Sequence, residues 1–124
     1  EFYRNPDLPD AFPFSSAVIS GDTIYLSGEI GVDYETMTLV EGGVAAETTK
    51  IFDNYEATLT ALGSGLDDIV KCTVFLADMS EWAAMNEVYV TFFPTHKPAR
   101  SAVGVNGLAL GARVEIECIA ALGE

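Results

Sequence analysis

Hydrophobic and polar positions change their period several times along the chain, and each change predicts an element. Residues 17–20 and 23–27 are rich in β-branched and apolar side chains and are separated by Gly21-Asp22. Because glycine accepts the positive φ of a tight turn, this pattern predicts a β-hairpin. Residues 1–13 hold three of the five prolines and show no period, which favours an extended lead-in. Residues 31–43 hold three glycines and are expected to form a loop.

Two amphipathic stripes follow. Between residues 44 and 62 apolar side chains recur every three or four positions, which predicts a helix that ends at Gly63. A second stripe runs from Trp82 to Phe93, with Ser80 as the expected N-cap and Pro94 at its end.

Three further segments, 66–77, 99–105 and 113–122, have the composition of strands. The order ββαβαββ predicts an α+β fold with a mixed sheet. Since crossover connections are right-handed, both helices should cover the same face of that sheet. Several strands are apolar on both sides, so we expect the uncovered face to be buried in an oligomer.

Composition narrows the class of protein. The 124 residues suit a single domain, 1–124, and 49% hydrophobic against 20% charged residues excludes a disordered chain. The net charge of −13 argues against nucleic acid or an anionic membrane as a partner. No apolar run approaches the roughly 20 residues of a membrane span, and no leader-like segment opens the chain. A cytoplasmic location is therefore expected.

Histidine and cysteine are too few for most metal chemistry. The chain has one histidine, His96, and two cysteines 46 residues apart, whereas structural zinc takes four such ligands. We expect no metal and no cofactor. His96 lies in a proline-flanked loop and should be exposed. The spacing of Cys72 and Cys118 leaves a disulfide open, but the apolar content does not require one, and small core residues are the favoured interpretation.

Two charged residues are candidates for chemistry. Arg100 precedes apolar strand residues and could hold a carboxylate with both guanidinium prongs, although a structural salt bridge is the more common role. Alternation places Glu115, Glu117 and Ile119 on one face of the last strand. Glu117, beside Ile119, should be half-buried with a raised pKa suited to a general base. Glu115, nearer the strand end, should be solvated.

Two further candidates are polar groups or glycines in apolar surroundings. Asn86 lies within the second helical stripe, where a buried amide would tie down a loop or contact a ligand. Gly28 and Gly31 are too sparse for a phosphate-binding loop, but their backbone N–H groups could face an anion.

Six segments together resemble the RidA (YjgF/YER057c/UK114) family, in family order, from about residue 13 to residue 121. The segments are Pro13-Phe-Ser-Ser-Ala-Val18, Tyr25-Leu-Ser-Gly-Glu-Ile30, Asp68-Ile-Val-Lys-Cys-Thr-Val-Phe-Leu-Ala-Asp-Met79, Asn86-Glu-Val-Tyr89, Lys97-Pro-Ala-Arg-Ser101 and Val114-Glu-Ile-Glu-Cys-Ile-Ala120. The Pro-Ala-Arg-Ser and Glu-Ile-Glu segments are the most diagnostic.

The resemblance implies a chorismate-mutase-like fold, a homotrimer with clefts between subunits, and cofactor-free deamination of reactive enamines and imines to 2-keto acids and ammonia. It also implies roles for individual residues. Arg100 would hold the substrate carboxylate, and Glu117 would position or activate water. Gly28, after Ser27, would contact the ligand through its backbone, and Asn86 would lie at the cleft.

Departures from the family pattern fall at the rim of the implied cleft. Phe14 replaces the usual tyrosine and removes its hydroxyl, and Ala102 stands where some members have cysteine. A small-carboxylate-binding or regulatory trimer with little turnover is therefore the alternative function. A third reading, the ribonuclease activity that parts of the family carry in their names (endoribonuclease L-PSP), fits poorly with the acidic charge and the single histidine.

Overall fold

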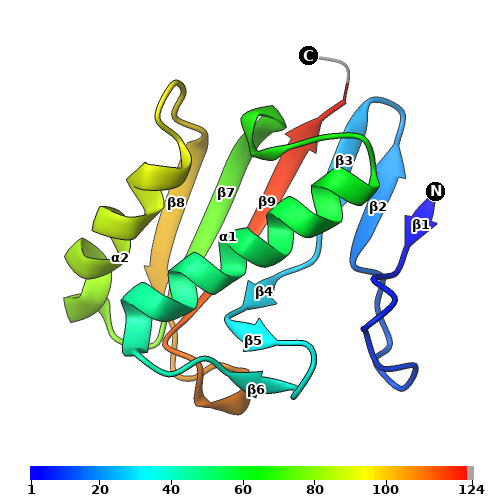
Figure 1. The fold of residues 1–124 in the computed structure, drawn as a ribbon. Coiled ribbons are helices and arrows are strands. Elements are labelled where there is room, and N and C mark those ends of the chain that lie inside the picture. The colour runs from blue at the N-terminus through cyan, green and yellow to red at the C-terminus, as the bar shows by residue number, and fades with distance from the viewer. Residues whose placement is uncertain (123–124) are drawn as a thin grey trace.

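The computed structural model describes residues 1–122, which form a mixed sheet with two helices on one face (Figure 1). The strand order is β1-β2-β3-β9-β7-β8, with β4 also paired to β9, and β7 with β8 is the parallel pair. The α+β prediction and its placement of both helices on one face are confirmed. The strands are β1 (Phe2–Tyr3), β2 (Ala17–Ser20), β3 (Thr23–Leu26), β4 (Glu29–Ile30), β5 (Val32–Asp33), β6 (Thr38–Leu39), β7 (Ile69–Leu76), β8 (Ala99–Gly104) and β9 (Val114–Ala121).

Two segments that were expected to lack strands contain short ones. The lead-in begins with β1, which pairs with β2, and the expected loop 31–43 contains the β5–β6 hairpin. A strand of two residues is too short to show alternation in the sequence. It forms because its backbone pairs with a neighbouring segment, which the local sequence does not reveal. The β2–β3 hairpin is confirmed, with Gly21 at φ +60° in its turn.

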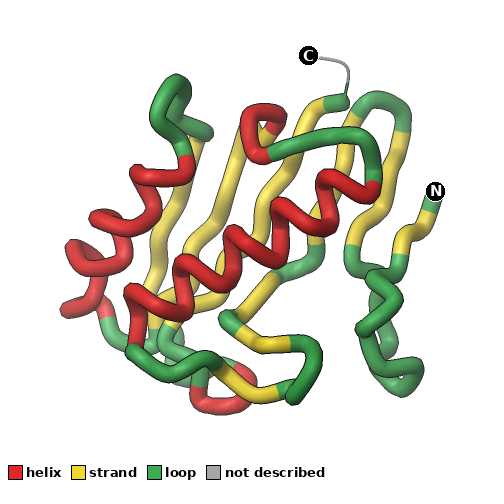
Figure 2. The backbone as a smooth tube through the Cα atoms, viewed as in Figure 1, coloured by secondary structure: helices red, strands yellow, loops and turns green. Residues whose placement is uncertain are grey.

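Helix α1 (Gly43–Ala61) lies across the sheet in Figures 1 and 2 and supplies much of the core. Its buried face includes Ile51, Phe52, Tyr55 and Leu59, each at most 1% exposed. The 3.6-residue period of the sequence thus gave the correct helix and the correct face.

Helix α2 (Trp82–Tyr89) is flanked by two 3-10 turns, η2 (Met79–Glu81) and η3 (Val90–Phe92). The N-cap expected at Ser80 is wrong, because Ser80 lies inside η2. Asp78 caps that turn, where its carboxylate accepts the Ser80 N–H at 2.9 Å, and Glu81 precedes α2 without a side-chain cap. The predicted strand 66–77 likewise begins with a 3-10 turn, η1 (Leu66–Asp68), before β7. A fourth 3-10 turn, η4 (Ala109–Gly111), precedes β9.

The two cysteines lie directly opposite each other on β7 and β9, with 4.1 Å between their Cα atoms, and are joined in a disulfide. Both cysteines are buried, as expected for core residues, but they are disulfide-bonded and not free thiols. Pairing depends on the register of two strands 46 residues apart, which the spacing in sequence does not reveal.

None of the helices among residues 1–122 is long and apolar enough to cross a membrane.

The second face of the sheet carries no helix within the described residues. Tyr25 on β3 and Val103 on β8 expose 49% and 43% of their surface there. Ile119 lies beside Tyr25 across the β3–β9 ladder. The uncovered face therefore exposes apolar side chains on β3 and β8.

Candidate functional site

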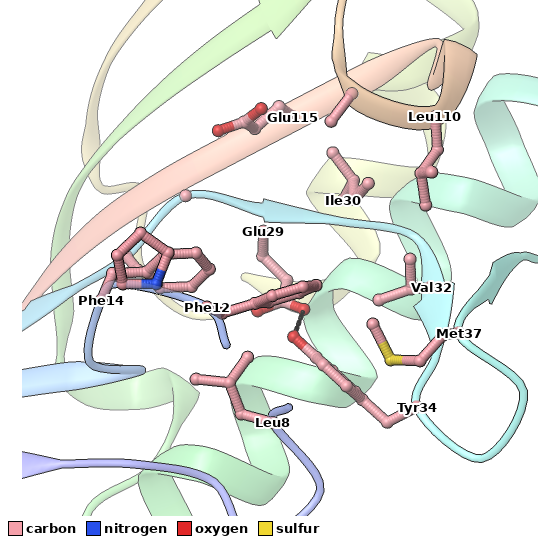
Figure 3. A pocket seen from close by; sticks show the side chains of 14 residues that line it. Leu8, Phe12, Phe14, Glu29, Ile30, Val32, Tyr34, Met37, Leu110 and Glu115 are labelled. Atoms are coloured by element: carbon pink, nitrogen blue, oxygen red, sulfur yellow. Dashed lines mark hydrogen bonds between the residues drawn. The ribbon is translucent and has the colours of Figure 1, made fainter. Parts of the chain in front are cut away.

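A cavity of about 540 Å³ opens where the N-terminal loop, the β3–β4 connection, the β5–β6 hairpin and η4 meet (Figure 3). Its walls are largely apolar, and its polar side chains are few. Among residues 1–122, no lysine or arginine lines it. The lining residues are Leu8, Phe12, Pro13, Phe14, Ser27, Gly28, Glu29, Ile30, Val32, Tyr34, Met37, Ala109, Leu110 and Glu115. A concave apolar cavity with a few convergent polar groups is the usual form of a small-molecule site.

Glu29 is the most strongly perturbed carboxyl group of the cavity wall. Burial raises its pKa from 4.5 to about 7. The Tyr34 hydroxyl donates to Glu29 Oε2 at 2.6 Å, and Asn54 Nδ2 on α1 donates to the same oxygen at 3.3 Å. These bonds lower the pKa, but desolvation outweighs them. Glu29 therefore changes charge near neutral pH, as groups at functional sites often do.

Glu115, and not Glu117, lines the cavity. Both point to the same side of β9, as the alternation predicted. Glu115 is half-buried, and burial together with the nearby Glu117 carboxylate raises its pKa. Glu117 is exposed. The expected burial of the two residues was therefore reversed, because Gly28 and Ile30 cover one end of β9 and leave Glu117 open.

Gly28, which the resemblance expected to contact a ligand through its backbone, lines this cavity. Gly28 has no side chain, and a Cβ at that position would collide with Oε2 of Glu115. Its absence lets the Glu115 carboxylate lie directly against the backbone of the β3–β4 connection. Ser27 also lines the cavity, although its hydroxyl donates to the Ser15 carbonyl at 2.5 Å. Phe14 lines the cavity as well, with its ring centroid 5.8 Å from that of Phe12.

Arg100 lies away from this cavity, on β8 and against α2. Its guanidinium donates to Asn86 Oδ1 at 2.6 Å and sits over the Tyr89 and Trp82 rings at 4.8 and 5.8 Å. Among residues 1–122 no carboxylate lies within ion-pair distance of it, so the structural salt bridge is not found in the described chain. Cation–π contacts hold a guanidinium without neutralising its charge. Arg100 therefore keeps a positive charge available to an anion.

The neighbours of Arg100 account for two further candidates. Asn86 does accept a hydrogen bond, but from Arg100 and not from a loop. Ala102 follows Arg100 on the same side of β8 and packs against the core. The Tyr89 hydroxyl is buried near Arg100 and has no hydrogen-bond partner within the described chain. The cavity with Glu115 and the cluster around Arg100 are thus separate regions of one chain.

His96 serves the fold. Its Nε2 lies 3.0 Å from the Ile69 carbonyl, and its ring meets that of Phe93 edge-on at 5.4 Å, so it is less exposed than the loop position suggested. In the part of the chain that the structure describes, no three or more His, Cys, Asp or Glu side chains gather as a metal site would require.

Comparison with known proteins identifies the family. The family model described as endoribonuclease L-PSP matches residues 7–122, nearly the whole chain. The chain belongs to this family. UK114 of Drosophila melanogaster, a RutC family protein, is 46% identical over 111 residues, which are 90% of this chain and 80% of that protein. A human relative named 2-iminobutanoate/2-iminopropanoate deaminase is 42% identical over 111 residues, 90% of this chain and 81% of that protein.

Solved structures of the family have the same fold. RidA from the Antarctic bacterium Psychrobacter sp. PAMC 21119 superimposes with a TM-score of 0.90 at 40% identity, covering 98% of this chain and 99% of that one. A Thermotoga maritima protein described as a putative endoribonuclease gives a TM-score of 0.92 at 37% identity, covering 100% and 99%. The resemblance stated from the sequence is confirmed.

Glu29, Tyr34 and Asn54 were missed by reasoning from the sequence. Ser27-Gly28-Glu29-Ile30 drew attention to its glycine, although a lone glutamate between apolar residues at a strand edge was an available signal. Nothing in the sequence pairs Glu29 with Asn54, which lies 25 residues later on α1.

Proposed function

We propose that this chain is an imine deaminase that hydrolyses 2-imino acids to 2-keto acids and ammonia. The observation that carries the proposal is a carboxylate, Glu115, held against the backbone of Gly28 in an apolar cavity. Membership of a family with curated members named 2-iminobutanoate/2-iminopropanoate deaminase supports the same reaction.

In this proposal Arg100 holds the substrate carboxylate, and it comes from a second copy of the chain. The cavity of one chain carries two carboxyl groups, Glu29 and Glu115, and no cation within residues 1–122. Such a cavity would repel an imino acid's carboxylate unless a positive charge were brought to it. Arg100 fits this need, because its guanidinium has no carboxylate partner in the described chain.

A cyclic trimer is the assembly we propose. The uncovered sheet face presents Tyr25, Val103 and Ile119 to a neighbour, and burial of this surface would stabilise the association. Each of three equivalent clefts would then combine the Glu115 cavity of one subunit with the Arg100 cluster of the next.

Glu115 takes the role that the resemblance gave to Glu117. An imine carbon is electrophilic when its nitrogen is protonated. Glu115 orients a water molecule and accepts its proton while the oxygen bonds to this carbon. The protonated Glu115 then gives this proton to the nitrogen of the carbinolamine. The carbon–nitrogen bond breaks to release ammonia, and the hydroxyl proton passes through the Glu115 carboxylate to the departing ammonia as the carbonyl group forms. Because imines hydrolyse readily, positioning supplies much of the rate enhancement.

The test uses a pair of variants from one strand face. Imines are generated from alanine by an amino-acid oxidase, and ammonia release is followed above the uncatalysed rate. Glu115→Gln should reduce kcat by about 100-fold or more, as expected for loss of a general base, whereas Glu117→Gln should retain nearly full activity. Loss of activity in Glu117→Gln alone would return the role to that residue. Wild-type rates in Arg100→Ala would refute the carboxylate contact.

A mixing experiment tests the second copy. Glu115→Gln and Arg100→Ala are co-expressed, so that mixed trimers contain some clefts with both native residues. Random mixing would restore roughly a quarter of the wild-type activity in a cyclic assembly. No recovery in mixed trimers would place both residues in a single subunit. Tight binding of 2-keto acids without turnover by the wild type would instead support the binding-protein alternative.

A further inference from the structure

Arg4 ties together the N-terminal loop that forms one wall of the cavity. Its Nη1 donates to the carbonyls of Phe12 and Phe14 at 3.0 and 2.5 Å, and its Nη2 donates to the carbonyl of Pro9 at 2.8 Å. Within residues 1–122 no carboxylate lies within ion-pair distance of Arg4. Its guanidinium is therefore used on three backbone carbonyls of one loop.

This loop has few other means of holding its shape. Prolines at positions 6, 9 and 13 remove backbone donors, and residues 4–16 contain no strand. Near its ends the Asn5 N–H donates to the Ser16 hydroxyl and the Ser16 N–H donates to the Tyr3 carbonyl, both at 2.8 Å. Within the loop, two turns are closed by the Leu8 N–H to the Asn5 carbonyl at 2.9 Å and the Phe12 N–H to the Pro9 carbonyl at 3.1 Å. These turns are local, whereas the fork of Arg4 joins the carbonyls of Pro9, Phe12 and Phe14 to one group and so fixes the two rings relative to each other.

The rings of Phe12 and Phe14 face the apolar part of the cavity. Figure 3 shows Phe12 beside Glu29 and Phe14 on the Glu115 side, with Leu8 and Tyr34 toward the bottom of the view. Between this wall and the hairpin residues Tyr34 and Met37 there is room for an apolar side chain. A branched apolar side chain has more surface to bury against these walls than a methyl group has.

We propose that Arg4 is a positioning residue that sets the cavity's selectivity for the size of the substrate side chain. It acts through Phe12 and Phe14 and touches neither the reacting carbon nor the substrate carboxylate. This inference rests on the proposed imine deamination.

The test compares two imines, one derived from alanine and one from leucine. Arg4→Met keeps the length of the stem and removes all three donors. We expect kcat/KM for the leucine-derived imine to fall by about 10-fold, mainly through KM, because packing of a few methyl and methylene groups carries discrimination of that size. The value for the alanine-derived imine should stay within about twofold of wild type. Arg4→Lys, which keeps the charge but not the fork, should give an intermediate ratio.

Two controls separate this role from a general loss of structure. Lys97→Met removes a positive charge from a loop that does not line the cavity and should leave the ratio of the two kcat/KM values unchanged. An equal fall for both imines in Arg4→Met, or no fall for either, would overturn the proposal.

Binding of the keto acid products tests the role of Arg4 without turnover. Affinities for pyruvate and 4-methyl-2-oxopentanoate are measured by calorimetry on wild type and Arg4→Met. The proposal expects about 10-fold weaker binding of the larger keto acid alone. Absence of imine hydrolysis in the wild type would refute the proposed function, and the selective loss of the larger keto acid would still decide the role of Arg4. Equal affinities in the two proteins would refute that role.

Discussion

Replacement of Glu29 by glutamine should stabilise the protein increasingly as pH rises from 5 to 8. Burial raises the pKa of Glu29 from 4.5 to about 7. Between these values the folded chain retains a proton on the carboxyl that the unfolded chain has released. Because the unfolded state then binds fewer protons, the free energy of unfolding falls as pH rises through this range. Above pH 7, where Glu29 is ionised in the folded chain as well, the free energy of unfolding is lowered by the full cost of the buried charge.

The magnitude follows from the two pKa values. Each tenfold change in proton affinity corresponds to about 1.4 kcal/mol, so the shift from 4.5 to about 7 costs roughly 3 kcal/mol once Glu29 is ionised. Glutamine is the same size and cannot ionise. Its amide oxygen can accept the same hydrogen bonds from Tyr34 and Asn54 that Glu29 Oε2 accepts. The stability difference between Glu29→Gln and wild type should therefore grow by about 2–3 kcal/mol between pH 5 and pH 8.

Urea denaturation at each pH measures this difference, with the protein concentration held constant because any assembly of copies would make stability depend on it. Glu56→Gln, on the exposed side of α1, makes the same substitution outside the cavity and is the matched control. The charged groups that act on Glu29, Glu115 and Lys50, are the same in both variants. A difference between Glu29→Gln and wild type that is constant from pH 5 to pH 8 would refute the reasoning.

Three further changes test the frame that holds the cavity. Tyr55→Phe removes a buried hydroxyl that lies against one carbonyl of the β3–β4 connection and one of β9, and should lower the free energy of unfolding in urea by about 1–3 kcal/mol; an unchanged midpoint would contradict this. Gly31→Ala would place a Cβ 2.7 Å from the Cα of Glu47 and should lower the free energy of unfolding by about 1–3 kcal/mol, with a lower Tm. The control is Gly65→Ala, whose Cβ would meet nothing within 4 Å and should not lower the Tm. The Glu47 carboxylate accepts a hydrogen bond from the Arg113 backbone N–H at 2.8 Å, so Glu47→Ala leaves that N–H without its acceptor. This variant should lower the free energy of unfolding by about 1–3 kcal/mol and speed hydrogen exchange at the Arg113 amide. Unaltered exchange would contradict the bond.

Local patterns were sufficient for the main elements of the fold. The helix over α1 followed from a period that places Ile51, Phe52, Tyr55 and Leu59 on one side. The β2–β3 hairpin followed from two β-rich runs around Gly21. These elements could be predicted because each depends on neighbours within a few residues, where chain geometry alone decides which side chains share a face.

The shorter strands could not be predicted for the opposite reason. Strands β1, β5 and β6 span two residues each, and each exists because a partner segment lies beside it. The disulfide between Cys72 and Cys118 also depends on a partner, since it requires β7 and β9 to pair in one particular register.

The candidate site shows where reasoning from the sequence ends. By itself the sequence determined the fold class, the family, and Arg100 as a cation to consider. Alternation also put Glu115 and Glu117 on one face of the last strand. It could not predict which of them is buried, because alternation shows to which side a side chain points and not which other segment covers it. The tertiary structure decided that the β3–β4 connection covers Glu115 alone, that Glu29 is desolvated beside Tyr34, and that Arg4 holds the facing wall. Burial and pKa depend on segments that are distant in sequence and meet only after folding.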